Sequence, residues 1–153
     1  MEPLSLDDIL DKNVMAVGLP GSTKADAIDA LSRKLLDAGY ITEIPGFEKD
    51  IFYRETLGKT GIGNYVAIPH GQSSYVKRNG IAIGKFKNEI PWESIDEKGV
   101  YVVCLFSVQD GDNGGNEHLR MLAALATKLG KDKVINALLA AGTVDEMVQA
   151  FDL

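Results

Sequence analysis

Residues 61–71 read GIGNYVAIPHG, and this stretch decides how the middle of the chain folds. The apolar residues 65–68 are typical of a short strand, and Pro69 fixes its own φ and favours extended geometry just before it. Gly71 allows the chain to turn away sharply, so we expect His70 to lie at the end of the strand with little backbone freedom. Such a position suits a nucleophilic histidine, and equally a structural histidine that caps a strand; the chain has only two histidines.

Three other apolar runs predict strands, at residues 13–19, 81–87 and 100–108. The run 100–108, VYVVCLFSV, is almost continuously apolar and rich in β-branched residues. We therefore expect it to form a central strand that is buried on both faces.

Apolar residues at helical spacing predict five helices, two of which carry a recognisable start. Thr23 is followed by Asp26, and Thr143 by Glu146, which is the spacing of a capping box. Turns are expected at residues 44–46 (IPG) and 91–92 (PW), and a flexible loop at residues 109–116 (QDGDNGGN). The expected helices cover residues 24–39, 47–57, 117–129, 133–141 and 144–151.

This order of strands and helices predicts an α/β fold: a single domain, residues 1–153, with a mixed, mostly buried β-sheet of about four or five strands flanked by helices. The 153 residues are enough to bury a hydrophobic core, and no repeat or interdomain linker interrupts them.

Composition excludes several classes of protein. The net charge of −6 argues against a general nucleic-acid binder, which needs a basic face. The single cysteine, Cys104, allows no internal disulfide and fits a reducing compartment. The N-terminal MEPLSLDDIL lacks the basic region of a signal peptide, and no apolar run approaches the roughly 20 residues that span a bilayer. We expect a soluble, cytoplasmic protein.

His118 and Arg54 are the other candidate site residues. His118 is expected to open a helix and shares an apolar stripe with Leu122 and Leu125, so it points toward the protein body; the free N–H groups of a helix start would favour an anion there. A half-buried structural histidine is the other interpretation.

The guanidinium of Arg54 suits phosphate oxygens, although an arginine on a helix is usually just solvated. The neighbouring Glu55 either orients Arg54 or a histidine, or belongs to the surface.

Other chemistries find little support. Residues 57–61, LGKTG, resemble the end of a P-loop, but the required first glycine falls at Tyr53 and the segment follows a helix, not a strand. Two distant histidines and Cys104 inside an apolar strand make a poor metal site. The Gly-x-Ser-x-Gly elbow of serine hydrolases is absent.

Several segments together resemble the enzyme IIA domain of the fructose–mannitol class, which belongs to the bacterial phosphoenolpyruvate-dependent sugar phosphotransferase system. The similarity covers nearly the whole chain in the right order, and the TGIG and AIPHG motifs are its most specific parts. The matching segments are Arg54-Glu55, residues 60–63 (TGIG), 66–71 (VAIPHG), 90–92 (IPW), 100–106 and 117–119 (EHL).

This resemblance implies an α/β fold and a phosphocarrier function. It implies that His70 carries a phosphoryl group as phosphohistidine, that His118 is the second active-site histidine, and that Arg54 contacts the phosphoryl group. The implied donor is phospho-HPr and the implied acceptor is a cysteine of an enzyme IIB domain. No metal or nucleotide cofactor is needed at this step, and the membrane is involved only through enzyme IIC.

The chain departs from the family pattern at Tyr65, where glycine is typical (GIGNGVAIPH). A tyrosine adds bulk there, so it is expected to affect the local loop and to contact a partner or shade His70. The chain ends soon after the last expected helix without an attached IIB or IIC region, so we expect a stand-alone subunit.

Three hypotheses follow. In the first, the protein is a phosphocarrier in sugar uptake, which residues 91–92 favour. In the second, it is a nitrogen-related regulatory enzyme IIA, in which the phosphorylation state of His70 controls other proteins. In the third, it is a non-catalytic α/β binding module whose histidines are structural.

Overall fold

The computed structural model describes residues 5–153, apart from the side chains of residues 112–114. Residues 1–4, part of the acidic N-terminal segment considered above, lie outside the described residues. The helices are α1 (Leu6–Ile9), the 3-10 turn η1 (Lys12–Val14), α2 (Lys24–Asp37), α3 (Ile44–Glu55), α4 (Asp112–Leu129), α5 (Asp132–Ala140) and α6 (Val144–Phe151). The strands are β1 (Met15–Leu19), β2 (Gly61–Gly63), β3 (Val66–Ala67), β4 (His70–Ser73), β5 (Gly80–Ile90) and β6 (Val100–Gln109).

These strands form one six-stranded mixed sheet, so the predicted sheet type is confirmed and the predicted strand number was slightly low. The order is β1-β5-β6-β3-β2, and β4 pairs with β6 further along the same side as β3. β5 and β6 are antiparallel, whereas β1 is parallel to β5, and β3 and β4 are parallel to β6.

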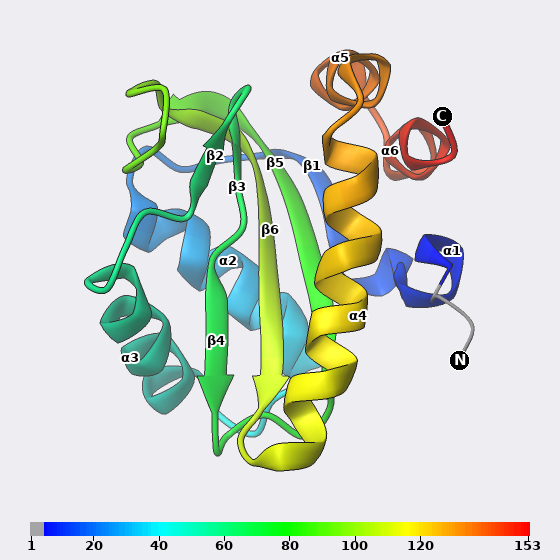
Figure 1. Cartoon of the computed structure of the whole chain (residues 1–153). Coiled ribbons are helices and arrows are strands. Elements are labelled where there is room, and N and C mark those ends of the chain that lie inside the picture. The colour runs from blue at the N-terminus through cyan, green and yellow to red at the C-terminus, as the bar shows by residue number, and fades with distance from the viewer. Residues whose placement is uncertain (1–4) are drawn as a thin grey trace.

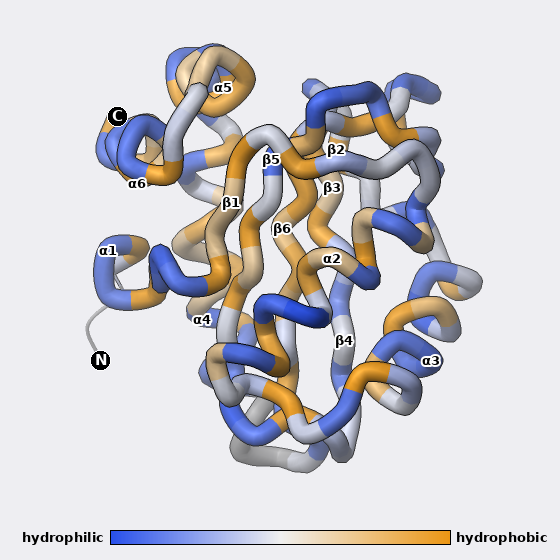
Figure 2. Tube along the Cα trace, turned by 180° about the vertical axis from the view of Figure 1, so that it is seen from behind, coloured by the Kyte–Doolittle hydropathy of each residue, from blue (hydrophilic) through white to orange (hydrophobic). Residues whose placement is uncertain are grey.

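Helices cover both faces of the sheet (Figure 1). α4 crosses one face, and α2 lies on the other together with the apolar side of α3. β6 contributes alternate residues to the two cores: Cys104 and Phe106 to the α4 side, Val103 and Leu105 to the α2 side. This confirms the prediction that β6 is buried on both faces, and Figure 2 shows the apolar residues concentrated on the central strands.

Both predicted N-cap residues are confirmed, but only Thr23 and Asp26 form the reciprocal bonds of a capping box. Thr23 caps α2, with its side chain accepting from the Asp26 amide and the Asp26 carboxylate accepting from the Thr23 amide. Thr143 caps α6 by accepting from the Glu146 amide, and the Glu146 carboxylate accepts a bond from the Thr143 hydroxyl. A side chain that binds the free N–H groups of a helix start stabilises it by about 1 kcal/mol.

The strand predicted over residues 13–19 begins only at Met15, because Lys12–Val14 form the 3-10 turn η1. Two other predicted non-helical segments are α-helical. Residues 44–46 form the first turn of α3, where the missing N–H of Pro45 costs nothing and the Glu43 carboxylate accepts from the Gly46 amide. α4 begins at Asp112, so the predicted loop 109–116 is mostly helix. Packing of α4 along the sheet outweighs the weak helix propensity of this glycine-rich start.

No helix among residues 5–153 combines the length and apolar character that crossing a membrane requires.

The contact between α2 and α3 includes a carboxyl pair, Asp29 and Glu48. Burial raises the pKa of Glu48 from its ordinary value of 4.5 to about 7, and the hydrogen bond and negative charge of Asp29 add to this effect. The folded state thus binds this proton more tightly than the unfolded state, and folding is disfavoured once Glu48 must ionise.

We therefore expect the contribution of Glu48 to the free energy of unfolding to fall as pH rises from about 4.5 to about 7. Glu48→Gln should remove this pH-dependent loss of stability. Urea unfolding at pH 5 and pH 8 measures it: the variant gains stability relative to the parent protein at pH 8 and much less at pH 5. The exposed Glu89→Gln is the matched control for loss of one carboxylate. A gain of the same size at both pH values would contradict the raised pKa.

Candidate active site

The edge strand that carries His70 is broken in two. β3 pairs with Val102 and Val103 of β6, the Ile68-Pro69 step interrupts the ladder, and β4 resumes it at His70 opposite Phe106. The Phe106 amide donates to the Pro69 carbonyl at 2.9 Å, which holds the interruption against β6. His70 thus begins a strand, and the prediction that it ends one was wrong.

Gly71 lies inside β4 and makes no sharp turn, which corrects a second expectation. A Cβ at this position would lie 2.3 Å from Cε1 of Phe47 and 3.0 Å from Cγ1 of Ile51, both on α3. Glycine is required here because α3 packs directly on the backbone of β4. The close approach brings the C-terminal end of α3 toward His70.

Three aromatic rings meet on the opposite face of the edge strand. His70 and Phe106, paired across β4 and β6, stack with ring centroids 4.9 Å apart and an interplanar angle of 22°. His118 of α4 meets both edge-on, 4.8 Å from His70 and 5.1 Å from Phe106. Since paired residues on neighbouring strands share a face, the register places His70 beneath α4.

His118 occupies the second turn of α4 and does not open the helix as expected, because the helix begins at Asp112. The anion-binding argument from a free helix start therefore does not apply to His118. Its inward orientation, expected from the shared apolar stripe, is what the structure has.

Arg54 lies in the last turn of α3, where its Nη1 donates to the Gly58 carbonyl at 3.4 Å. A hollow of about 580 Å³ brings the three candidate residues together. Its walls come from α3, β4, the end of β6 and α4. Residues that line it include Asp50, Arg54, His70, Gln72, Asp110 and His118.

Burial keeps both imidazoles uncharged. It lowers the pKa of His70 to about 4, with smaller contributions in the same direction from His118 and Arg54, and it also lowers the pKa of His118. A neutral imidazole retains a lone pair for nucleophilic attack. The Nδ1 atoms of both rings are shielded from solvent and without a geometrically good hydrogen-bond partner among the described residues, and a backbone interaction with Ile68 opposes the lowering of the His70 pKa. Because Nδ1 is shielded, we expect Nε2 to be the nitrogen of His70 that reacts.

Tyr65 adopts an unusual backbone conformation. Asn64 and Tyr65 join β2 to β3 with φ values of 56° and 66°, the left-handed pair of a tight hairpin turn, where glycine is favoured. The Tyr65 ring packs against Tyr101, with centroids 5.6 Å apart. The loop therefore keeps a geometry natural for glycine while holding a tyrosine.

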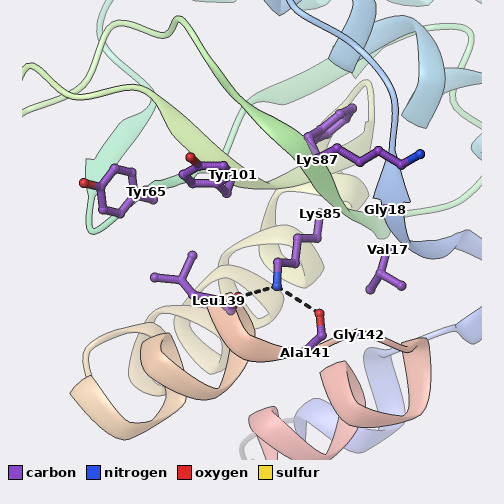
Figure 3. Close-up of a pocket in the computed structure, with 10 residues that line it drawn as sticks. Val17, Gly18, Tyr65, Lys85, Lys87, Tyr101, Leu139, Ala141 and Gly142 are labelled. Atoms are coloured by element: carbon purple, nitrogen blue, oxygen red, sulfur yellow. Dashed lines mark hydrogen bonds between the residues drawn. The ribbon is translucent and has the colours of Figure 1, made fainter.

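Tyr65 belongs to a second hollow, of about 600 Å³, and does not line the one that holds His70, so it does not shade that histidine as expected (Figure 3). Lys85 projects into this second hollow and donates to the carbonyls of Leu139 and Ala141, the latter at 2.9 Å. These bonds satisfy the C-terminal end of α5 and explain the lysine as a helix cap. The His70 hollow is thus the better candidate for chemistry.

Glu55 is a functional candidate that the sequence left ambiguous. Its side chain is only 6% exposed and contacts Lys24 and Thr60, so it neither bonds a histidine nor belongs to the open surface. The Thr60 and Trp92 contacts around it were not foreseen, because only the fold brings these positions together.

Metal and thiol chemistry gain no support. Among the described side chains, which exclude those of residues 112–114, no three His, Cys, Asp or Glu gather as a metal site. Cys104 is buried in β6, and burial raises the pKa of its thiol to about 12.

Comparison with known proteins gives a family match over residues 8–152, to the family described as "Phosphoenolpyruvate-dependent sugar phosphotransferase system, EIIA 2". The chain is 29% identical over 148 residues to the mannitol-specific phosphotransferase enzyme IIA component of Bacillus subtilis, covering 94% of this chain and 96% of that protein. It is 28% identical over 150 residues to the 2-O-alpha-mannosyl-D-glycerate-specific EIIABC component of Escherichia coli. That match covers 97% of this chain but only 23% of the longer relative.

A solved structure with the same fold is the enzyme IIA of the mannitol system of Escherichia coli, in complex with phosphorylated enzyme IIB. Its TM-score is 0.78 at 22% identity, with 94% of this chain and 96% of that chain covered. The α/β fold expected from the sequence is therefore confirmed.

The lowered pKa of His70 gives a direct test of the site. Proton–carbon NMR titration of the imidazoles should show His70 uncharged from pH 8 down to pH 5 and protonating near pH 4. Because the folded state favours the neutral form, this group should also reduce stability as pH falls from about 6.5 to about 4. His70→Ala identifies the remaining signals as those of His118, and a His70 pKa at or above 6.5 would contradict the buried position.

Proposed function

Because the chain belongs to the EIIA family of the phosphoenolpyruvate-dependent sugar phosphotransferase system, in its fructose–mannitol class, we propose that it is a phosphocarrier in sugar uptake. EIIA components are phosphotransferases. In this proposal His70 accepts a phosphoryl group from phospho-HPr and passes it to an enzyme IIB. The observation that carries the proposal is the meeting of His70, His118 and Arg54 in one hollow.

The reaction starts from neutral His70. Its Nε2 lone pair attacks the phosphorus of phospho-HPr in line, the phosphorus–nitrogen bond to HPr breaks, and that electron pair stays with the HPr imidazole. Transfer to enzyme IIB repeats the exchange, with a cysteine thiolate as nucleophile and His70 as leaving group. No metal ion or nucleotide enters either step.

Arg54 and His118 have supporting roles. Phosphoryl transfer passes through a loose transition state with negative charge on the equatorial oxygens, so positioning and charge stabilisation dominate catalysis. The guanidinium of Arg54 suits those oxygens, and the His118 ring, edge-on to His70, fixes the orientation of the nucleophile. Burial makes His70 a weak base, which helps it to leave when the phosphoryl group moves on.

The partners follow from the family. The solved complex of the mannitol enzyme IIA with phosphorylated enzyme IIB has the fold of this chain and supports a IIB acceptor. Since residues 8–152 match one family, we assign the whole chain, residues 1–153, to one EIIA domain acting in the cytoplasm beside HPr.

Incubation with phosphoenolpyruvate, enzyme I and HPr tests the carrier step. Intact mass and peptide mapping, under conditions that preserve acid-labile phosphohistidine, should find one phosphoryl group on His70. His70→Ala should abolish labelling because the nucleophile is lost. His118→Ala should still accept the group but pass it to enzyme IIB slowly, since the orienting ring is gone.

Unlabelled protein beside active enzyme I and HPr would return the non-catalytic binding module to first place. A labelled protein that donates to none of the IIB domains of fructose and mannitol systems would favour the regulatory branch of the family. Transfer from His118→Ala at the parental rate would contradict the role given to His118.

Exposed apolar side chains beside the hollow give a second test. Tyr53 of α3 and Leu57, two residues after the end of α3, line the hollow and are 65% and 63% exposed; Leu119, next to His118, is 62% exposed. Apolar groups around a reactive centre suit a modest, transient protein interface. Leu57→Ser should raise the KM for phospho-HPr by roughly tenfold with a smaller effect on kcat, since truncation at an interface centre costs about 1–2 kcal/mol.

Ile95 provides the matched control. It is 71% exposed but lies in the β5–β6 connection, outside the lining of this hollow, so Ile95→Ser should leave the KM unchanged. Equal effects of the two substitutions would remove the argument for docking at this surface.

A further inference from the structure

A hydrogen-bonded cluster lies behind the site and joins three separate parts of the chain. The hydroxyl of Thr60 donates to the Glu55 carboxylate, at 2.7 Å to Oε2, and accepts from Nε1 of Trp92 at 2.8 Å. Lys24 of α2 donates to Oε1 of Glu55 at 2.8 Å, and its ammonium lies 4.9 Å from the centroid of the Trp92 ring. These four residues are called the Thr60 cluster below.

The cluster is largely shielded from solvent, and its polar groups bond one another, while Lys24 also bonds the exposed Glu93. Thr60 is 3% exposed, Trp92 6%, and the Glu55 side chain 6%. A carboxylate in such surroundings is strongly held when it is paired and hydrogen-bonded, and removing one partner leaves a buried charge unsatisfied. The positions of Glu55 and Thr60 relative to each other are therefore fixed.

Thr60 connects the two segments that carry the site. Through its hydroxyl it binds Glu55, which directly follows Arg54 at the end of α3. Through its carbonyl it accepts from the amide of Ile68 at 2.9 Å, two residues before His70. One residue thus links the segment that carries the guanidinium to the segment that carries the imidazole, although neither bond touches the reacting groups.

We propose that Thr60 and Glu55 are positioning residues that hold Arg54 in register with His70, so that the guanidinium meets the oxygens of the phosphoryl group in transit. This inference deepens the proposed function and rests on it. Small misplacements of a catalytic group cost large factors in rate, so the cluster acts on the transfer step and leaves partner docking unchanged.

The matched pair Thr60→Val and Thr60→Ser tests the proposal. Valine keeps the shape of threonine and loses the hydroxyl, whereas serine keeps the hydroxyl. With phospho-HPr as donor, Thr60→Val should lower kcat at least about tenfold and leave the KM within about twofold, and Thr60→Ser should restore most of the rate. Far-ultraviolet circular dichroism and urea unfolding verify that the variants are folded at the assay temperature; the emission of Trp92 is not used, because this residue bonds Thr60 directly.

A double-mutant cycle with Arg54→Gln separates positioning from general stability. If the cluster acts through Arg54, Thr60→Val adds little further loss once Arg54 has been replaced, whereas independent effects would multiply. Glu55→Gln, nearly the same size, serves as the second variant if Thr60→Val does not fold, and it should show the same dependence on Arg54.

Two results would overturn the proposal: a folded Thr60→Val protein with parental kcat, or losses that multiply fully with that of Arg54→Gln. Either leaves the phosphocarrier function intact, because the parent protein is still labelled on His70. If the parent protein itself accepts no phosphoryl group, the proposed function fails, and the positioning role fails with it.

Discussion

The parallel pairing of β6 with the broken edge strand β3–β4 is the constraint on which the site depends. The Ile68-Pro69 step interrupts the ladder, and the bond from the Phe106 amide to the Pro69 carbonyl fixes where it resumes. A shift of one residue would turn His70 to the other face of the sheet. Because Phe106 is fully buried in the core, its ring is a rigid support for the imidazole, and α4 places His118 against both.

The cation of the site, Arg54, comes from α3, which packs on the opposite face of the same edge strand. Gly71 allows α3 to pack on the β4 backbone, and the last turn of α3 then presents Arg54 to the hollow that contains His70. The site is thus assembled around the edge of the sheet, with imidazoles on the α4 side and the guanidinium arriving from α3. This arrangement requires β4 to be an edge strand, because Arg54 reaches the imidazoles around its unpaired side. An interior strand has a neighbouring strand on that side.

Features that depend on local sequence patterns, and those implied by the family resemblance, were predictable from the sequence. The Thr23 capping box, the doubly buried β6 and the grouping of His70, His118 and Arg54 by resemblance all agree with the structure. Effects that depend on distant packing were not: the role of Gly71 requires Phe47, and the early start of α4 requires the sheet beneath it. The cluster around Thr60 was likewise hidden, because Trp92 lies 32 residues further along the chain.

The electrostatics of the hollow fit the proposed phosphocarrier role, which requires that a phosphoryl group be both held and released. Burial favours the neutral form of both imidazoles, so in the proposed reaction Arg54 would meet the incoming group without two further cations that would trap it. A phosphoryl group adds about −1.5 to −2 charges at neutral pH. Asp50 and Asp110 also line the hollow, and their carboxylates repel that charge while Arg54 attracts it. Binding that stabilises the intermediate too strongly would slow its transfer. Among the described residues that line the hollow, the balance of one cation against two carboxylates would limit such trapping.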